Sequence, residues 1–284
     1  MKNNDLANEL MEQADIPVFL RCKWDALIEE LAAYQSAVVA YSGGVDSSFL
    51  AYAAALALGK RMVAVTLAST VETPETLKNA EEFAAQHGFK HIMIPYDPLQ
   101  SAEFRSNPAR RCYFCKTNML KELWNYARQF DYQAVLDGQN EDDRRDYRPG
   151  NKAIEETDTQ SPLAQQGFSK ADIRRLAKAL GLVVWDKPST PCLATRIPYG
   201  LPITEDVLRR VAQAEQYLHQ KGFQIVRVRY HHELARIEID PARIQKLLDL
   251  REEVVSYFKQ IGFLYITLDL QGYRLGSLDE GLSL

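Results

Sequence analysis

The chain has 284 residues, of which 46% are hydrophobic and 25% charged, and its formal net charge is −4. This length can bury a sizeable core without disulfides, and the slight acidic excess gives no general attraction to a polyanion such as nucleic acid. No apolar run could span a bilayer, and the N-terminus lacks the basic and apolar regions of a signal peptide. We therefore expect a cytoplasmic protein of one large or two modest domains, with neither a nucleic acid nor a membrane as partner.

The first two thirds of the chain alternate buried strands with helices. Helical spacing of apolar residues predicts a first helix over 17–34. The strands expected after it are 36–41, 62–67, 90–95 and 133–137, and the helices are 48–58, 74–87, 116–128 and 169–180. This alternation predicts an α/β fold with a doubly wound parallel sheet, in which ligands bind at the carboxyl ends of the strands.

A second, smaller unit is expected at the C-terminal end. The charged stretch 141–160 is typical of a mobile loop. After it, Thr204 is a suitable N-cap for a helix to residue 218. Strands 224–230 and 234–239, a helix over 241–261 and a strand over 264–270 follow. This order predicts a small α+β unit over 201–284, after a main domain over 1–200.

The turn between the first strand and the next helix reads Ser-Gly-Gly-Val-Asp-Ser, residues 42–47. Two glycines let the backbone approach a ligand, and a helix N-terminus offers N–H groups to an anion. The turn lacks the Gly-Lys-Ser/Thr end of a Walker loop and the Gly-x-Gly-x-x-Gly spacing of dinucleotide-binding proteins. It resembles instead the PP-loop of ATP pyrophosphatases, which split ATP between its α and β phosphates. An ordinary glycine turn is the structural alternative.

Three of the four cysteines suggest chemistry. Cys112 and Cys115 form a CxxC motif among basic residues that favour the thiolate, and Cys192 lies in the proline-rich segment 188–200. Three thiols with one open position match a site-differentiated iron–sulfur cluster, whereas zinc would usually need a fourth protein ligand. Cys22 lies on the apolar face of the first predicted helix, so we expect it to be a small core residue.

Two charged pairs lie in the predicted C-terminal unit. Arg227 and Arg229 are two apart on a strand and leave its same face, an arrangement suited to phosphate. Glu215 and Glu238 could bind a hard divalent cation. For both pairs the alternative is a solvated surface.

Seven segments of the chain taken together carry a family resemblance. They are 42–47, 107–116, 137–143, 146–150, 161–163, 185–188 and 192–200. Their combination resembles the LarE family, ATP-dependent sulfur transferases of nickel-pincer nucleotide synthesis. The resemblance implies a PP-loop fold of the adenine nucleotide alpha hydrolase type and a homo-oligomer. It also implies that ATP adenylates the carboxylates of pyridinium-3,5-biscarboxylic acid mononucleotide, and that a sulfur nucleophile then displaces AMP to give thiocarboxylates.

The resemblance also implies roles for particular residues. ATP and Mg²⁺ would be held by Ser42, Gly43, Gly44, Val45, Asp46, Ser47 and Asp137. The substrate phosphate would be bound by Thr195, Arg196, Arg227 and Arg229, and a divalent ion by Glu215 and Glu238. The catalytic residues would be Asp46 and Cys192, the sulfur-bearing cysteine.

The sulfur source stays open, because this chain departs from the one-cysteine members of the family. In those members the cysteine gives up its own sulfur. The additional CxxC motif instead implies a [4Fe-4S] cluster on Cys112, Cys115 and Cys192 that carries a replaceable sulfide, refilled by a sulfur donor. Two other functions compete with this reading. A PP-loop tRNA thiolase would need a basic RNA-binding surface, and a non-catalytic ATP- or redox-sensing module could use the same fold.

Overall fold

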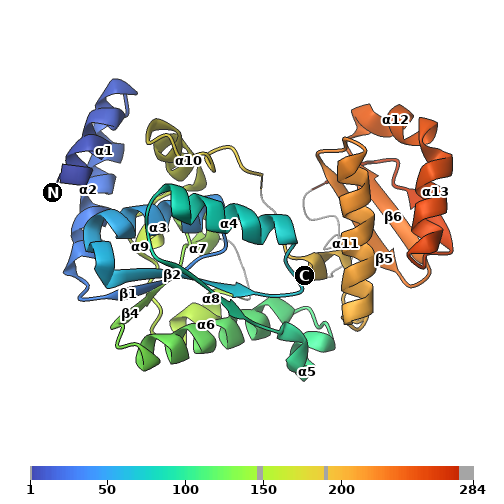
Figure 1. Ribbon diagram of the computed structural model, residues 1–284, viewed down its shortest axis with the longest axis horizontal. Coiled ribbons are helices and arrows are strands. Elements are labelled where there is room, and N and C mark those ends of the chain that lie inside the picture. The colour runs from blue at the N-terminus through green and yellow to red at the C-terminus, as the bar shows by residue number, and fades with distance from the viewer. Residues whose placement is uncertain (1, 146–149, 189–190, 275–284) are drawn as a thin grey trace. The chain divides into compact units, whose positions relative to one another are not determined.

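The computed structural model describes residues 2–145, 150–188 and 191–274 (Figure 1). Contacts within the chain divide it into two compact units. The first comprises Met1–Asp97 and Cys112–Thr190, and the second comprises Pro98–Arg111 and Pro191–Leu284. The sequence suggested a single boundary after residue 200. In the structure, residues 191–200 and the separate segment Pro98–Arg111 both belong to the second unit.

A four-stranded parallel sheet forms the centre of the first unit. Its order is β3-β2-β1-β4, with β1 (Ala37–Ala40), β2 (Met62–Ala68), β3 (His91–Pro95) and β4 (Ala134–Leu136). Ala37 of β1 lies opposite Met62 of β2 on one side and Ala134 of β4 on the other. The strand order reverses between β1 and β4, which is where ligands bind in such sheets. The predicted doubly wound parallel sheet is confirmed.

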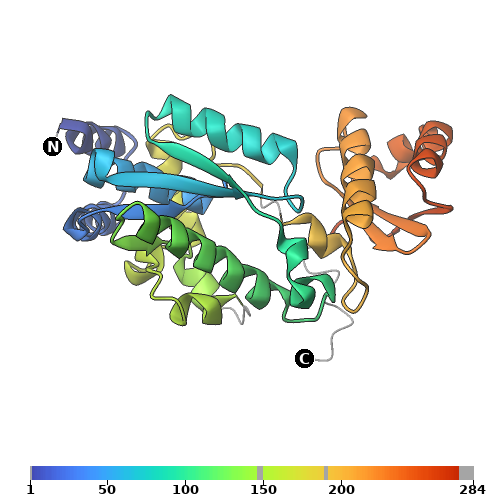
Figure 2. The same ribbon diagram turned by 60° about the horizontal axis from the view of Figure 1, so that its bottom comes forward.

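Helices cover both faces of this sheet, and Figure 2 shows α4 and α6 on opposite sides of it. Side chains alternate along a strand, so Val39 packs into the core beneath α2, α3, α4 and α10, whereas Val38 packs into the core beneath α6. The long helices of this unit are α1 (Lys2–Gln13), α2 (Val18–Ala33), α3 (Val45–Leu58), α4 (Pro74–Gln86), α6 (Arg111–Gln129) and α10 (Lys170–Ala179). Each predicted helix is present, and α1 was not predicted.

The charged stretch expected to be a loop contains short helices. They are α7 (Glu141–Arg145) and α8 (Asn151–Glu155), and α9 (Pro162–Gln165) follows them. The Asp143 amide donates to Asn140 Oδ1, and the Asn140 amide donates to Asp143 Oδ2, so the polar side chains form a reciprocal cap that starts α7. The prediction of a loop was therefore wrong for these residues. Residues 146–149 lie outside the described chain.

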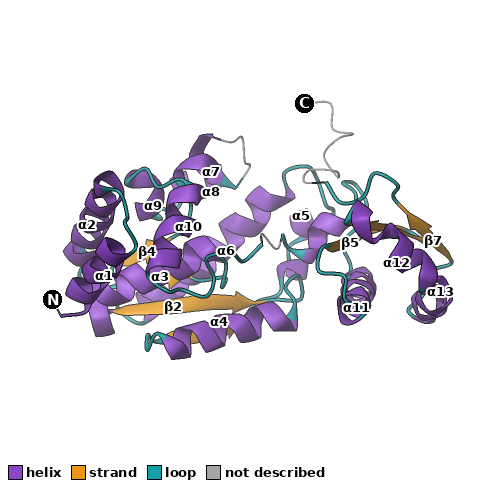
Figure 3. Ribbon diagram, turned by 90° about the horizontal axis from the view of Figure 1, so that it is seen from above, coloured by secondary structure: helices purple, strands orange, loops and turns teal. Residues whose placement is uncertain are grey.

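The second unit is an α+β arrangement, as predicted (Figure 3). Its strands β5 (Val226–His231) and β6 (Leu234–Ile239) are antiparallel, and β7 (Tyr265–Leu268) runs parallel to β6. Helix α11 (Glu205–Gln220) starts at Thr204, whose hydroxyl accepts the Val207 amide, so the predicted N-cap is confirmed. The single helix expected over 241–261 is instead η4 (Pro241–Arg243), α12 (Ile244–Asp249) and α13 (Arg251–Gln260).

Segment Pro98–Arg111 contributes η2 (Pro98–Gln100) and α5 (Ala102–Arg105) to the second unit. The first unit also has one turn of 3-10 helix, η1 (Gly59–Arg61), before β2. Among the described helices, none has both the length and the apolar character needed to cross a membrane.

Candidate active site

Residues 42–47 form the turn between β1 and α3, at the carboxyl end of the parallel sheet. The Ser42 and Ser47 hydroxyl oxygens are 3.1 Å apart, and the Ser42 amide donates to Ser47 Oγ over 3.3 Å. No side chain of the described residues caps α3 at its N-cap, Gly44. The first amide groups of α3, the helix dipole and two hydroxyls therefore converge on one place, which suits a phosphate group.

Two glycines make this turn possible. Gly43 has φ +70°, and a Cβ atom there would lie 2.8 Å from Cβ of Ala80 on α4. Gly138 follows β4, and a Cβ atom there would lie 3.0 Å from the Ser47 amide nitrogen. Only glycine avoids both the strained conformation and the collision at Gly43. The backbone of the turn is thus fixed by its neighbours in the way that a ligand cradle requires.

Asp46 lies in the first turn of α3 with its carboxylate in two different environments. Its Oδ2 accepts a hydrogen bond of 2.5 Å from Lys170 on α10. Its Oδ1 is buried without a hydrogen-bond partner among the described residues. Burial raises the pKa of Asp46 although Lys170 acts to lower it. A buried oxygen left without a partner is costly, and a hard cation such as Mg²⁺ would satisfy it, so Asp46 fits the predicted ion.

Sequence reasoning assigned no role to Lys187, which lies near the C-terminal end of the first unit's sequence and contacts the same turn. Its Nζ donates to the Gly43 carbonyl over 2.9 Å. Arg174 of α10 holds this segment in place by donating to the carbonyls of Trp185 (2.8 Å) and Lys187 (2.7 Å). Burial lowers the pKa of Lys187. The signal for it in the sequence was the absence of a lysine from the turn itself, which leaves the charge to a lysine elsewhere in the chain.

Glu72 is a second residue that the sequence did not single out. It lies between β2 and α4, and its Oε2 is buried without a hydrogen-bond partner in the described part of the chain. Burial raises the pKa of Glu72 to about 7, against the lowering effect of Lys187. This carboxyl group therefore changes its charge near neutral pH at the edge of the sheet where the turn lies.

Asp137 directly follows β4 and precedes Gly138, which lies beside Ser47 of the turn, and its ATP-binding role stays a prediction. Its Oδ2 is 3.1 Å from Nζ of Lys116, and its Oδ1 accepts the Gln139 amide over 2.8 Å. Lys116 thus contacts Asp137, while Lys170 contacts Asp46 and Lys187 contacts Gly43, all at or beside the turn. Cationic charge is available there without a Walker lysine.

In the second unit, Cys192 begins a turn of 3-10 helix, η3 (Leu193–Arg196), and is partly exposed. Its carbonyl oxygen accepts three hydrogen bonds. They come from the Thr195 amide (3.0 Å), the Thr195 hydroxyl (2.8 Å) and Nη1 of Arg196 (3.1 Å). The backbone around the predicted sulfur-bearing residue is therefore held firmly.

Comparison with known proteins identifies the family. A family model described as NAD synthase matches residues 23–126, which include the turn at 42–47. The chain is 36% identical to the pyridinium-3,5-bisthiocarboxylic acid mononucleotide synthase of Lactiplantibacillus plantarum, over 93% of this chain and 96% of that enzyme. The chain belongs to the LarE family. The chain is also similar to two uncharacterized proteins. One, from Synechocystis, is 42% identical over 93% of this chain and 99% of that protein. The other, from Methanocaldococcus jannaschii, is 31% identical over 84% of this chain and 90% of that protein.

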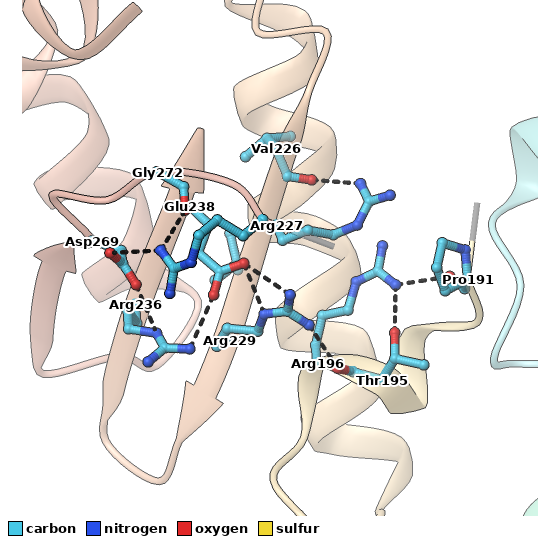
Figure 4. A network of polar contacts seen from close by, with 12 residues as sticks. Pro191, Thr195, Arg196, Val226, Arg227, Arg229, Arg236, Glu238, Asp269 and Gly272 are labelled. Carbon is cyan, nitrogen blue, oxygen red and sulfur yellow. Dashed lines mark hydrogen bonds and ion pairs between the residues drawn. The ribbon is translucent and has the colours of Figure 1, made fainter. Parts of the chain in front are cut away.

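The LarE resemblance suggested substrate-phosphate roles for Arg196 and Arg229, and in the structure each makes a buried ion pair. Figure 4 shows the pair of Arg229 with Glu238. Arg196 donates from Nε and Nη2 to the two carboxylate oxygens of Glu215, both over 2.9 Å. Arg229 donates from Nε (3.0 Å) and Nη2 (2.8 Å) to Oε2 of Glu238. These side chains are at most 6% exposed, so the alternative of a solvated surface does not apply to them.

The same contacts bear on the divalent ion predicted at Glu215 and Glu238. Oε1 of Glu215 also accepts the Val228 amide over 2.9 Å, and Oε1 of Glu238 accepts from Arg236 over 2.9 Å. All four carboxylate oxygens therefore already accept hydrogen bonds. No group of three or more His, Cys, Asp or Glu side chains in the described ranges is placed to hold a metal ion. The arrangement indicates that Glu215 and Glu238 act as counter-ions of the two arginines. The divalent ion at these glutamates stays a prediction.

Arg227 has different contacts from those of Arg196 and Arg229. Its guanidinium lies 5.3 Å from the ring centre of Tyr273 and donates to the carbonyl of Val226 over 2.7 Å. Burial lowers the pKa of Arg227, and the nearby positive charge of Arg196 acts in the same direction. A guanidinium in this position suits an anion such as a phosphate monoester.

The cysteines of the LarE resemblance lie on both units. Cys112 and Cys115 are in the first turn of α6, three residues apart and thus on one helix face, whereas Cys192 is in the second unit. Cys112 is exposed, and Sγ of the half-buried Cys115 lies 3.8 Å from the Met119 sulfur. Cys22 is exposed, so its assignment to the core was wrong. The apolar stripe of α2 passes instead through Leu20, Trp24, Leu27 and Leu31.

Proposed function

We propose that this chain is an ATP-dependent sulfur transferase that makes thiocarboxylates on pyridinium-3,5-biscarboxylic acid mononucleotide, the precursor of the nickel-pincer nucleotide cofactor. The observation that carries this function is the 36% identity, over 93% of the chain, to a protein named as the synthase of the bisthiocarboxylic acid mononucleotide. The geometry of residues 42–47 supports it, because two hydroxyls and the first amides of α3 converge there in a way that suits phosphate.

The first step uses ATP at the PP-loop. A substrate carboxylate oxygen attacks the α phosphorus, the bond to the β phosphate breaks, and pyrophosphate leaves as the acyl adenylate forms. Ser42, Ser47 and the first amides of α3 would bind the phosphates, and Asp46 would hold Mg²⁺ through its unpartnered Oδ1. The amino groups of Lys170 and Lys187 would offset the charge of the departing pyrophosphate. Asp137 would complete the ATP-binding set at the end of β4.

The second step transfers sulfur. A sulfur nucleophile attacks the acyl carbon, and AMP leaves with the bonding electron pair. Cys192 would serve this step in one of two ways. As the sulfur source, its thiolate would attack the acyl carbon and displace AMP, and loss of the Cα proton would then break the Cβ–Sγ bond, releasing the thiocarboxylate and leaving dehydroalanine. Alternatively, Cys192 would be a ligand of a [4Fe-4S] cluster with Cys112 and Cys115, and a sulfide supplied by the donor would be the nucleophile. The adjacent thiols of the CxxC motif suit two of the cluster's ligands. Arg227 would bind the phosphate of the nucleotide.

The proposal includes three features of the protein as a whole. It would take sulfide from a separate sulfur donor if the cluster is present, act as a homo-oligomer, and work in the cytoplasm. The LarE resemblance and the composition of the chain support these features.

The decisive experiment incubates the protein with α-labelled ATP and the biscarboxylate mononucleotide. We expect AMP and pyrophosphate that depend on the mononucleotide, and a thiocarboxylate product detected by mass spectrometry. Asp46→Ala should form no AMP, because the ion of the leaving group loses its ligand. Exposed Arg251→Ala is a suitable control that should keep activity, since its ion pair with Glu252 is at the surface. Release of ADP instead of AMP would rule out the proposed chemistry.

A further inference from the structure

Arg196 connects the turn that carries Cys192 to helix α11. Figure 4 shows its guanidinium directed at Pro191 and Thr195 of that turn. Besides its two hydrogen bonds to Glu215, its Nη1 donates to the carbonyls of Pro191 (2.7 Å) and Cys192 (3.1 Å) and to the Thr195 hydroxyl (2.8 Å). We infer that Arg196 is a positioning residue for Cys192, and that Glu215 acts by orienting Arg196. This assigns Arg196 a role other than binding the substrate phosphate.

The hydrogen-bond capacity of the guanidinium leads to this assignment. A guanidinium has five N–H groups in a fixed planar fork. The Nε and Nη2 edge is matched to both oxygens of Glu215, and Nη1 faces three acceptors of the turn. The Arg196 side chain is only 2% exposed and that of Glu215 6%. A phosphate could bind here only by displacing contacts that are already buried and charge-assisted.

A second arginine holds the same turn from the other side. Arg229 donates from Nη1 to the carbonyl of Thr195 over 2.8 Å, while Glu238 accepts from its Nε and Nη2. The turn is therefore fixed at Cys192 and at Thr195 by two arginines, each oriented by its own buried glutamate. Glu215 also accepts the Val228 amide, so the position of the turn depends on how α11 and β5 pack.

The consequence for catalysis follows from geometry, and it depends on the proposed function. Sulfur transfer requires the nucleophile near the acyl carbon at a defined angle, and loss of orientation slows such a step strongly. In the proposed function adenylation uses the PP-loop, and the contacts of Arg196 described above are with Glu215 and the Cys192 turn. A loosened Cys192 turn should therefore slow sulfur transfer while adenylation continues.

The first test needs no substrate. We would measure amide hydrogen exchange in Arg196→Met/Glu215→Gln, in which glutamine still offers an oxygen to the Val228 amide and no bare carboxylate stays buried. The Thr195 amide, which donates to Cys192, should exchange at least about tenfold faster than in the wild type. The control is Arg209→Met on the same helix, whose ion pair with Asp206 is exposed. Unchanged exchange at Thr195 in the double variant would overturn the inference.

The second test separates positioning from phosphate binding. The double variant should bind the mononucleotide within about twofold of the wild type and still form AMP, but its thiocarboxylate formation should fall about a hundredfold. Arg227→Ala should instead weaken mononucleotide binding about tenfold or more. A tenfold weakening in the Arg196 variant would assign Arg196 to the substrate phosphate and contradict the inference.

A conservative variant distinguishes shape from charge. Arg196→Lys keeps the positive charge but has one nitrogen, which cannot span Glu215 and the turn together. We expect it to lose sulfur transfer as the double variant does, and full activity would contradict the positioning role. If the wild type forms no AMP with this mononucleotide, the proposed function fails, whereas the exchange result still decides whether Arg196 holds the turn.

Discussion

Single replacement of Arg196 by methionine should destabilise the second unit more than replacement of both members of its ion pair. Arg196→Met leaves the Glu215 carboxylate 6% exposed with only the Val228 amide as donor. Breaking a buried pair in this way costs about 3–5 kcal/mol, because the remaining charge loses its paired partner. The positive charge of nearby Arg227 favours the lower end of that range. In Arg196→Met/Glu215→Gln no charge is left, and the hydrogen bonds from Arg196 to the turn, each worth about 0.5–1.5 kcal/mol, are lost in both variants. The double variant should therefore be the more stable of the two.

Urea unfolding can measure this difference in the full chain. All three tryptophans, Trp24, Trp124 and Trp185, lie in the first unit, so their fluorescence reports on that unit, whereas far-UV circular dichroism reports on both. At about 2 kcal/mol per molar urea, the single variant should lower the midpoint of the second unit by roughly 2 M. The double variant should recover the part of that shift that comes from the bare carboxylate. A double variant no more stable than the single one would show that lost packing of Arg196, and not the bare carboxylate, causes the damage.

Three further outcomes are expected. Burial raises the pKa of Glu72 in the folded chain from its ordinary value to about 7, so its stabilising contribution is present at low pH and is lost as pH rises through about 7. Melting temperatures measured from pH 5 to 8 should therefore fall less steeply in Glu72→Gln than in the wild type, and parallel curves would contradict the raised pKa. Gly43→Ala should weaken ATP binding at least about tenfold and destabilise the chain by roughly 1–3 kcal/mol. The control is Gly167→Ala, which has a similar φ of +67° but no atom within 4 Å of the added Cβ, so it should lower stability without changing ATP affinity. Calorimetric titration of both variants with ATP measures this difference, and equal ATP affinity would refute the collision with Ala80. Mass spectrometry after turnover should show an intact Cys192 if a cluster-bound sulfide is the source, whereas a loss of about 34 Da would show that this cysteine gave up its own sulfur.

The local pattern of the sequence was enough to predict the parallel sheet and the PP-loop. Buried strands such as residues 37–40 and 62–68 read as continuous apolar runs, and two adjacent glycines between a strand and a helix have few other uses. It failed for Cys22, because helical spacing does not fix the edge of an apolar stripe to one residue. It also failed at α7, where capping by Asn140 and Asp143 outweighed a composition typical of loops.

Contacts between distant residues explain what could not be predicted at the candidate site. Lys187 and Gly43 are 144 positions apart, and no local signal relates them. The spacing of Arg227 and Arg229 predicted that both leave one strand face, but the antiparallel register decides that Glu238 lies opposite Arg227. Charges that look exposed in a strand can thus be buried by a partner strand that sequence alone does not align.

The discontinuity of the second unit affects how the chain can fold during synthesis. Nδ2 of Asn107 donates to the carbonyls of Pro198 (2.8 Å) and Leu201 (2.9 Å), which follow it by 91 and 94 residues. On the ribosome, segment 98–111 emerges well before these acceptors, and the whole of the first unit's remaining sequence is made in between. The segment therefore cannot form these contacts until the last third of the chain has been synthesised. Such long-range closure slows folding, and a fragment beginning at residue 191 would lack a piece of its own structure.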